Sequence, residues 1–239
     1  MGIDMQRREK MKRRQSKQSG NTILEFALVM IFLVPMFAGA FTIGMALAKD
    51  IQVSNVARDA AVLMVRAVTD PESGLDLSQT NNQRIIVRAA NGLGMNSDAQ
   101  QDPSSTGNGV VILSKVVMVG PAECSVGVVP APTGAPPWNA GNCANYGQYV
   151  FAYRVVIGNG SRWTSQLGSP SSAVRSDGTV SPANIATNTG NRVTNFPGIV
   201  GMTLTASTFA LISEMYADVS FLNFFNILGN PTLYARSVS

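Results

Sequence analysis

A glycine, an asparagine and a glutamate stand at the start of the longest apolar run in the chain. Residues 20–26 read Gly-Asn-Thr-Ile-Leu-Glu-Phe, and no charge follows Glu25 until Lys49. An ionised carboxylate inside hydrocarbon is costly, so an acid within a membrane usually has a partner. Cleavage after Gly20 would supply one, because the new α-amine of Asn21 is a cation. This spacing points to proteolytic processing followed by charge pairing between helices.

Few other residues could do chemistry. The chain contains no histidine, so the usual general base near neutral pH and the commonest metal ligand are both missing. Asp70, Glu72 and Asp76 surround Gly74 like part of a calcium loop, but the central glycine and the closing glutamate are not at the expected positions. A solvated turn is the favoured interpretation. We therefore predict no enzymatic activity, no cofactor and no metal.

The positive charge is concentrated at the N-terminus. Residues 1–20 hold seven Lys or Arg and two acidic residues, and the rest of the chain is close to neutral. A nucleic-acid-binding protein needs a basic face on a folded domain, whereas a short basic tail beside an apolar segment fits the positive-inside rule. We predict no nucleic-acid partner, and we expect residues 1–19 to be disordered unless they lie against anionic lipid.

Residues 22–48 are long and apolar enough to cross a membrane as a helix. Their only charge is Glu25, and about 20 helical residues span the hydrocarbon core. Pro35 should kink or loosen this helix, and Ala40, Gly44 and Ala48 share one face. Helical periodicity continues to about residue 68, with an apolar stripe formed by Ile51, Val53, Val56, Ala57, Ala60, Ala61, Met64, Val65 and Val68.

Three interpretations of the N-terminus remain open. A cleaved secretory signal would use Ala46-Leu47-Ala48, but the apolar run is too long for one and contains Glu25 and Pro35. An uncleaved anchor would leave Glu25 near the membrane interface. A class III signal would be cut after Gly20 on the cytoplasmic side. The basic tail, Gly20, the acid at the fifth mature position and the aromatic Phe26 favour the third interpretation.

This pattern resembles the type IV prepilin family, and most of all the TadE-like pseudopilins of the tight-adherence pilus system. The resemblance covers about residues 17–48, with weaker likeness in 49–68 and in the closing strand at Leu233–Arg236. It implies a prepilin peptidase, other pilin subunits and the pilus assembly machinery as partners. Asn21 replaces the phenylalanine of the major pilins, which leaves methylation of the new terminus open.

The remainder predicts an exported α+β domain. Asp70-Pro71-Glu72-Ser73-Gly74 should end the long helix, and a second helix should run from Ser78 or Thr80 to Ala90, with Ile85, Ile86 and Ala89 on one face and Gly92 as its stop. Residues 96–108 read as a linker. Strands are expected at 110–119, 149–157, 203–220 and 232–238, in a small antiparallel sheet. Residues 158–195 should form surface loops around weak elements.

Two further features belong to this exported part. Cys124 and Cys143 lie in one loop rich in proline, glycine and asparagine, and export favours a disulfide between them over two buried thiols. Phe221, Phe224 and Phe225 could form an adhesive patch, although packing aromatics are the favoured interpretation.

We therefore expect a basic leader at 1–20, a transmembrane helix at 21–48, its continuation at 49–68 and an exported α+β domain at 69–239. The predicted protein is a pseudopilin-like subunit of the bacterial inner membrane. Its N-terminus would be cytoplasmic and its domain periplasmic or extracellular, and it would serve pilus assembly and surface adhesion. The main alternative is an uncleaved anchor that presents a binding domain. An exported enzyme would need a Ser/Asp/Lys site, and none is evident in the sequence.

Overall fold

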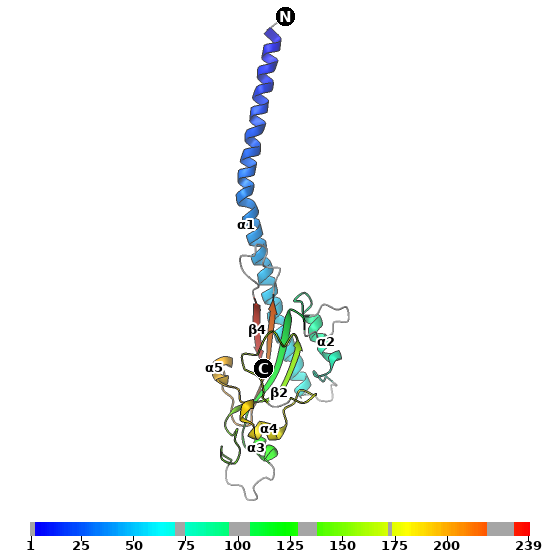
Figure 1. Cartoon of the computed structure of the whole chain (residues 1–239), viewed down its shortest axis with the longest axis vertical. Coiled ribbons are helices and arrows are strands. Elements are labelled where there is room, and N and C mark those ends of the chain that lie inside the picture. The colour runs from blue at the N-terminus through cyan, green and yellow to red at the C-terminus, as the bar shows by residue number, and fades with distance from the viewer. Residues whose placement is uncertain (1–2, 70–74, 96–105, 129–137, 172–173, 219–231) are drawn as a thin grey trace. The chain divides into compact units, whose positions relative to one another are not determined.

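The computed structural model describes residues 3–69, 75–95, 106–128, 138–171, 174–218 and 232–239, with side chains from Thr22 onward. These residues form two compact units, residues 1–47 and residues 48–239, which we describe separately. The elements, labelled in Figure 1, are α1 (Ile3–Thr69), α2 (Thr80–Ala89), β1 (Gly109–Met118), α3 (Pro121–Gly127), β2 (Tyr149–Gly158), α4 (Pro182–Thr187), η2 (Thr189–Asn191), α5 (Phe196–Val200), β3 (Phe209–Asp218) and β4 (Thr232–Val238).

Helix α1 begins earlier than predicted. It includes the basic tail from Ile3 and ends at Thr69, close to the expected end. The expectation of a disordered tail is therefore wrong for residues 3–19. Methionine, glutamine, lysine and arginine are good helix formers, and extending an existing helix avoids the cost of a new nucleus. The helix also continues through Pro35.

The second unit is built on a four-stranded antiparallel sheet with the order β2-β1-β3-β4. Figure 1 shows these strands side by side. The sheet and its flanking helices confirm the α+β class. Strand β3 starts at Phe209 and not at Thr203, because residues 205–208 form a turn in which the Thr208 amide donates to the Thr205 carbonyl oxygen. Ser207 has a φ of 60° within that turn.

One face of the sheet packs against the second half of α1. Most of the predicted stripe is buried there, and its fully buried members are Val53, Val56, Ala57, Ala60, Ala61 and Met64. Each large side chain buried in this way contributes about 1.5–3 kcal/mol of transfer free energy. Ile51 departs from the prediction, because 61% of its surface is exposed.

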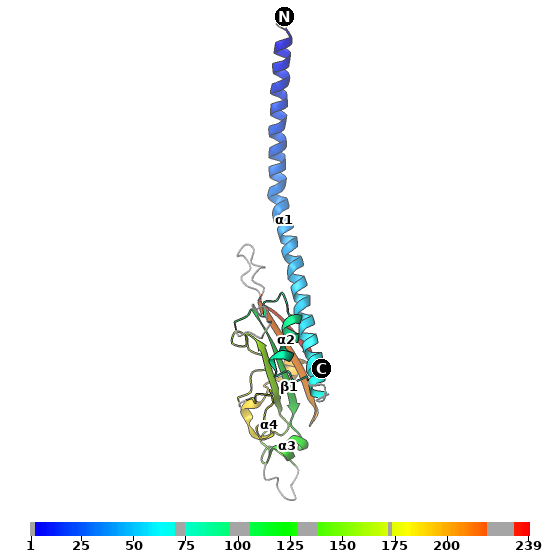
Figure 2. The same cartoon turned by 90° about the vertical axis from the view of Figure 1, so that its right-hand side faces the viewer.

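Helix α2 lies beside α1 on the same face of the sheet (Figure 2). Its bounds confirm the predicted helix, and Gly92, with a φ of 88°, follows its end. Ile85, Ile86 and Ala89, predicted on one face, all line one groove beside α1. Ile86, Val87 and Ala90 enter the core, whereas Ile85 is 44% exposed and Ala89 is exposed as well.

The other face of the sheet is covered by the segment predicted to form surface loops. The weak elements α4, η2 and α5 occur there as expected, but residues between 159 and 204 also bury Leu167, Val180 and Phe196 against the sheet. The Phe196 ring stacks on Tyr149 with ring centroids 4.7 Å apart. This irregular segment therefore forms the second layer of the core.

The disulfide between Cys124 and Cys143 is present, which confirms the predicted pairing. Both cysteines are fully buried, in a small cluster with Val117, Val119 and Val150. Cys124 lies on the short helix α3, which was not predicted. The sequence does contain residues typical of a helix start, namely Pro121 at the first helical position and Glu123 two residues later. In the structure the Glu123 carboxylate accepts a hydrogen bond from the Gly120 amide at 2.9 Å and so caps α3.

Replacing both cysteines by alanine should lower the free energy of unfolding by about 3 kcal/mol, because the open loop raises the entropy of the unfolded chain. Urea denaturation of the full chain in detergent measures this change. Reduced wild-type protein is the matched control and should show a similar loss. A loss of less than about 1 kcal/mol in both samples would contradict a stabilising role for the disulfide.

Candidate functional site

The predicted processing bond lies inside helix α1. Gly20 and Asn21 are both helical, and their side-chain surroundings lie outside the described part of the chain. Glycine in a helix interior costs about 0.5–1 kcal/mol relative to alanine, because it loses the most backbone freedom on folding. The bond after Gly20 is therefore at a position where the helix is intrinsically weak.

Glu25 and Phe26 follow one turn later, and both are exposed. Residues four apart lie on the same helix face, so Glu25 and Asn21 are neighbours along α1, about 6 Å apart along the axis. An α-amine created at Asn21 would thus lie within reach of this carboxylate and of those on adjacent helices. Helix α1 brings the four predicted processing and assembly residues together, whereas Cys124 and Cys143 belong to the other unit.

The helix surface after Glu25 is almost entirely apolar and open. Ile23, Phe32, Phe37 and Phe41 each expose 69–70% of their surface. Apart from the adjacent residues and the nearby backbone of α1 itself, no described atom lies within 4 Å of a Cβ placed on Gly39 or Gly44. By length and composition the described helix Thr22–Val68 could cross a membrane, with a mean hydropathy of 2.4 over its most apolar window. Such a surface requires lipid or other helices around it.

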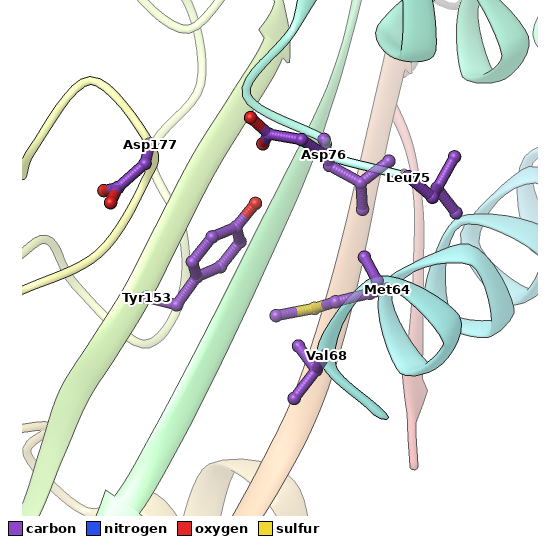
Figure 3. A pocket seen from close by; sticks show the side chains of 8 residues that line it. Met64, Val68, Leu75, Asp76, Tyr153 and Asp177 are labelled. Atoms are coloured by element: carbon purple, nitrogen blue, oxygen red, sulfur yellow. The ribbon is translucent and has the colours of Figure 1, made fainter. Parts of the chain in front are cut away.

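The second unit contains a cavity of about 290 Å³ between the end of α1 and strand β2. Figure 3 shows the Tyr153 side chain between Asp76 and Asp177, with Met64, Val68 and Leu75 on the opposite side. Hydrogen bonding to Ser78 lowers the pKa of Asp76, and hydrogen bonding to Thr179 lowers the pKa of Asp177. Burial raises the pKa of Tyr153.

Because of these pKa shifts, Asp76, Asp177 and Tyr153 do not gain or lose protons near neutral pH. Both carboxylates stay ionised there and the phenol stays neutral, so none of the three has the pKa of a general acid or base at pH 7. Asp76 instead holds a turn, because its Oδ1 accepts from the Ser78 amide at 2.8 Å. This agrees with the turn interpretation. Asp70 and Glu72 of the calcium-like pattern lie outside the described residues.

A buried polar cluster surrounds Glu214, which the sequence did not identify. Glu214 lies on β3, fully buried, and its carboxylate accepts from the Ser165 hydroxyl, from the Gln166 amide at 3.2 Å and from the Tyr234 hydroxyl at 3.1 Å. The residue that could have indicated this cluster is Arg236, because it carries the opposite charge and lies directly opposite Glu214 in the register of β3 and β4.

The cluster is a structural network. Burial raises the pKa of Tyr234 to about 12 and also raises that of Tyr216, so both phenols remain donors at neutral pH. Burial lowers the pKa of Arg154, and the negative charge of Glu214 opposes that shift. The Arg236 guanidinium donates to the Tyr234 hydroxyl at 2.7 Å and to the Ile199 carbonyl oxygen, which ties β4 to α5. Glu214 thus joins the sheet to its covering segment.

Some expected features cannot be placed. Phe221, Phe224 and Phe225 of the predicted adhesive patch lie outside the described residues, as does the turn at 229–231. Within the described parts of the chain, no group of three or more His, Cys, Asp or Glu side chains is arranged to hold a metal ion.

Comparison with known proteins gives one match. A family model described as TadE-like protein matches residues 20–62. No curated protein and no solved structure matches the chain. The matched range starts at Gly20, includes Glu25 and Phe26, and extends through the membrane-length helix into the part of α1 that packs on the sheet. Residues 20–62, which include Gly20, Asn21, Glu25 and Phe26, are therefore similar to the TadE-like family.

Proposed function

We propose that this protein is a pseudopilin-like subunit of a tight-adherence pilus, cleaved by a prepilin peptidase after Gly20. The observation that carries the proposal is the family match, which begins at the residue where cleavage was predicted. TadE-like proteins are structural subunits, which agrees with a function in assembly and not in catalysis.

Residues 1–20 act as a leader that keeps the N-terminus cytoplasmic. Their positive charges resist translocation, so residues 22–48 insert with the following domain on the far side of the inner membrane. A disulfide in that domain suits an oxidising compartment such as the periplasm. Removal of the leader then leaves a helix with an amine at its start and a mostly apolar surface.

Glu25 supplies the specificity of the assembly step. Burying its carboxylate among helices is unfavourable unless a cation accompanies it. The Asn21 amine of a neighbouring subunit is that cation, and it exists only after cleavage. Processing and assembly are linked in this way, because the uncleaved subunit has no α-amine at Asn21. Phe26 lies beside Glu25 and contributes apolar contact area at the same level of the helix.

The exported unit faces the periplasm or the cell surface, where it contributes to adhesion. Its partners are the peptidase, other pilin or pseudopilin subunits, the assembly machinery and membrane lipid. If the leader is retained, the protein is instead a static anchor for its exported domain.

Replacing Glu25 by alanine tests the assembly step. The variant should be cleaved normally, yet the amount recovered in sheared surface filaments should fall at least about tenfold, the effect of losing 1.4 kcal/mol per subunit contact. Immunoblotting of membrane and filament fractions measures both quantities.

Two further variants sharpen this experiment. Glu25→Gln keeps the shape but not the charge and should assemble as poorly as alanine. Thr42→Ala removes another polar group of the apolar segment, a hydroxyl that donates to the Ala38 carbonyl oxygen at 2.5 Å, and should assemble normally. Unchanged assembly of both Glu25 variants would remove the charge-pairing role.

A further inference from the structure

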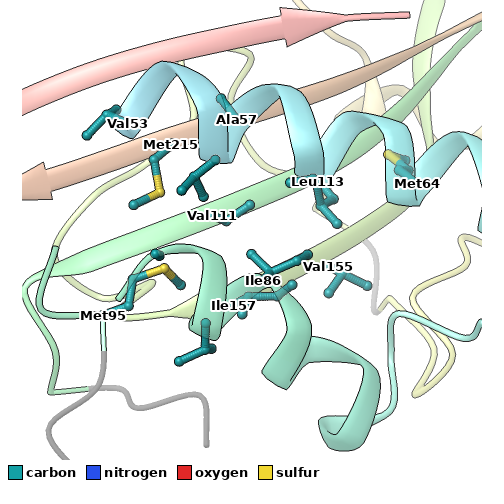
Figure 4. Packing of buried hydrophobic residues seen from close by; sticks show 14 of the residues in the cluster. Val53, Ala57, Met64, Ile86, Met95, Val111, Leu113, Val155, Ile157 and Met215 are labelled. Carbon is teal, nitrogen blue, oxygen red and sulfur yellow. The ribbon is translucent and has the colours of Figure 1, made fainter. Parts of the chain in front are cut away.

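The disulfide lies outside the main core of the second unit. Figure 4 shows that core, in which Val53 of α1 packs above the sheet residues Val111 and Met215. Cys124 and Cys143 belong to a separate, smaller cluster that shares no buried residue with it. Proteins open locally in units that can separate from the rest of the fold. The cysteine cluster can therefore open while α1 stays packed on the sheet.

Helix α4 covers the disulfide. Cys124 and Cys143 expose none of their surface, although both lie in short surface elements. Helix α3, which carries Cys124, packs beside α4 (Figure 1). Gly127 at the end of α3 has no space for a side chain, because a Cβ there would collide with the side chain of Ala186. The carbonyl oxygen of Ala186 also lies 3.6 Å from the sulfur of Cys143.

One buried asparagine fastens α4 and the residues after it to the turn that carries the second cysteine. The backbone amide of Asn145 donates to the Ala186 carbonyl oxygen at 2.9 Å. Its side-chain amide donates to the carbonyl oxygens of Ile185 and Asn188 at 2.8 and 2.9 Å, and its side-chain oxygen accepts from Arg192 at 2.9 Å. These side-chain partners follow Asn145 by 40 to 47 residues. We call residues 182–192 the α4 segment.

Burial of both sulfurs limits the chemistry of this disulfide. A disulfide forms and breaks by attack of a thiolate on a sulfur, through a mixed disulfide, and the attacking thiolate needs access to that sulfur. No sulfur surface is accessible while the α4 segment is in place. Because oxidation and reduction pass through the same mixed disulfide, both reactions require the α4 segment to be displaced.

We propose that the α4 segment controls thiol–disulfide exchange at Cys124 and Cys143, so that the pair is oxidised before this segment docks and is inaccessible to reductants afterwards. The oxidant is a protein disulfide of the exported thiol-oxidase class. One cysteine thiolate attacks it, forming a mixed disulfide and releasing one oxidase thiol. The second cysteine thiolate attacks the chain's own sulfur in that mixed disulfide and releases the other oxidase thiol. Two electrons and two protons thus pass from the chain to the oxidase.

The compartment of this oxidant rests on the proposed function, because only an exported unit meets an exported oxidase. The covering of the disulfide does not depend on it. The two claims can therefore be tested on one sample by separate measurements.

Reduction under native conditions tests the covering. The full chain in detergent is treated with dithiothreitol, and the thiols are trapped with a maleimide-polyethylene glycol that shifts the band on a gel. The chain has two cysteines, which form one disulfide, so the shift reports this bond alone. The wild type should be reduced at least about 100-fold more slowly than the same chain unfolded in urea. A difference of less than about tenfold overturns the inference.

Two variants test the contact that fastens the α4 segment. Asn145→Ala removes three side-chain hydrogen bonds to that segment and should raise the rate of native reduction at least about tenfold. Arg192→Ala is the milder variant, to be used even if Asn145→Ala does not fold. Arg192 is exposed, and it donates to Asn145 and, at 2.7 Å, to the Ala144 carbonyl oxygen. Its replacement should raise the rate about fivefold.

Thr187→Ala is the matched control on the same helix. Thr187 is exposed and its hydroxyl donates to the Ala183 carbonyl oxygen at 2.7 Å within α4, so this variant should be reduced like the wild type. Circular dichroism of the oxidised samples verifies that each variant is folded. Unchanged reduction of the folded Asn145 and Arg192 variants overturns the inference, and so does an equal acceleration by Thr187→Ala.

Mass spectrometry of the N-terminus in the same samples separates the two claims. A slowly reduced disulfide on a chain that keeps residues 1–20 supports the covering and contradicts the proposed function. A rapidly reduced disulfide on a chain that begins at Asn21 overturns the covering and leaves the proposed function intact.

Discussion

If the chain is cleaved as proposed, replacing Gly20 by alanine or valine should leave a full-length precursor in the membrane. A peptidase pocket that receives glycine next to the cut bond clashes with any larger side chain, and valine adds the most bulk. Processing of the valine variant should fall at least about tenfold, and alanine should show a smaller but clear loss. The ratio of precursor to mature protein on an immunoblot measures the effect.

Gly39→Ala is the matched control for this experiment. It lies in the same helix, no described atom surrounds the added methyl group, and it strengthens the helix by the same propensity gain of about 1 kcal/mol. Normal cleavage of Gly39→Ala with reduced cleavage of Gly20→Ala assigns the effect to the cut site and not to helix stability. If the Gly20 variants are processed like the wild type, the class III assignment is wrong.

Replacing Glu214 by alanine should unfold much of the second unit at physiological temperature. The change leaves the Ser165 hydroxyl, the Gln166 amide and the Tyr234 hydroxyl without their acceptor. It also removes the negative charge that favours the cationic form of the buried Arg154. Removing one partner from a buried charged network costs about 3–5 kcal/mol, a large share of the stability of a single domain.

Two variants make this prediction specific. Glu214→Gln keeps the shape and part of the hydrogen bonding, so its loss should be smaller, about 1–3 kcal/mol. Asp50→Ala removes an exposed carboxylate of α1 and should change stability by less than about 0.5 kcal/mol. Thermal unfolding of the full chain in detergent gives all three values. Equal melting temperatures for Glu214→Ala and the wild type would show that the network is not required.

Most regular elements could be predicted because their signals are local. The end of α1, both bounds of α2 and the strands β1, β2 and β4 follow from apolar periodicity and from breakers such as Pro71 and Gly92. The processing segment is equally local, since Gly20, Glu25 and Phe26 lie within seven residues of one another. Local reasoning failed at residues 3–19, because a helix can extend into residues that would not start one. It also missed α3 and placed the start of β3 too early.

The second layer of the core could not be predicted, because its contacts are distant in sequence. Ser165 and Glu214 are 49 residues apart, and no periodicity in residues 159–204 indicates which side chains face the sheet. The burial of residues on α2 is a similar case. Ile85 and Ile86 are equally apolar, and only packing against α1 and the sheet decides which of them is buried.

The N-terminal residue of the wild-type protein in the membrane is the most direct test of the proposed function. Intact-mass analysis with N-terminal sequencing should find a chain that begins at Asn21, with or without methylation of its amine. A chain that still carries residues 1–20, or one cut after Ala48, would contradict the account.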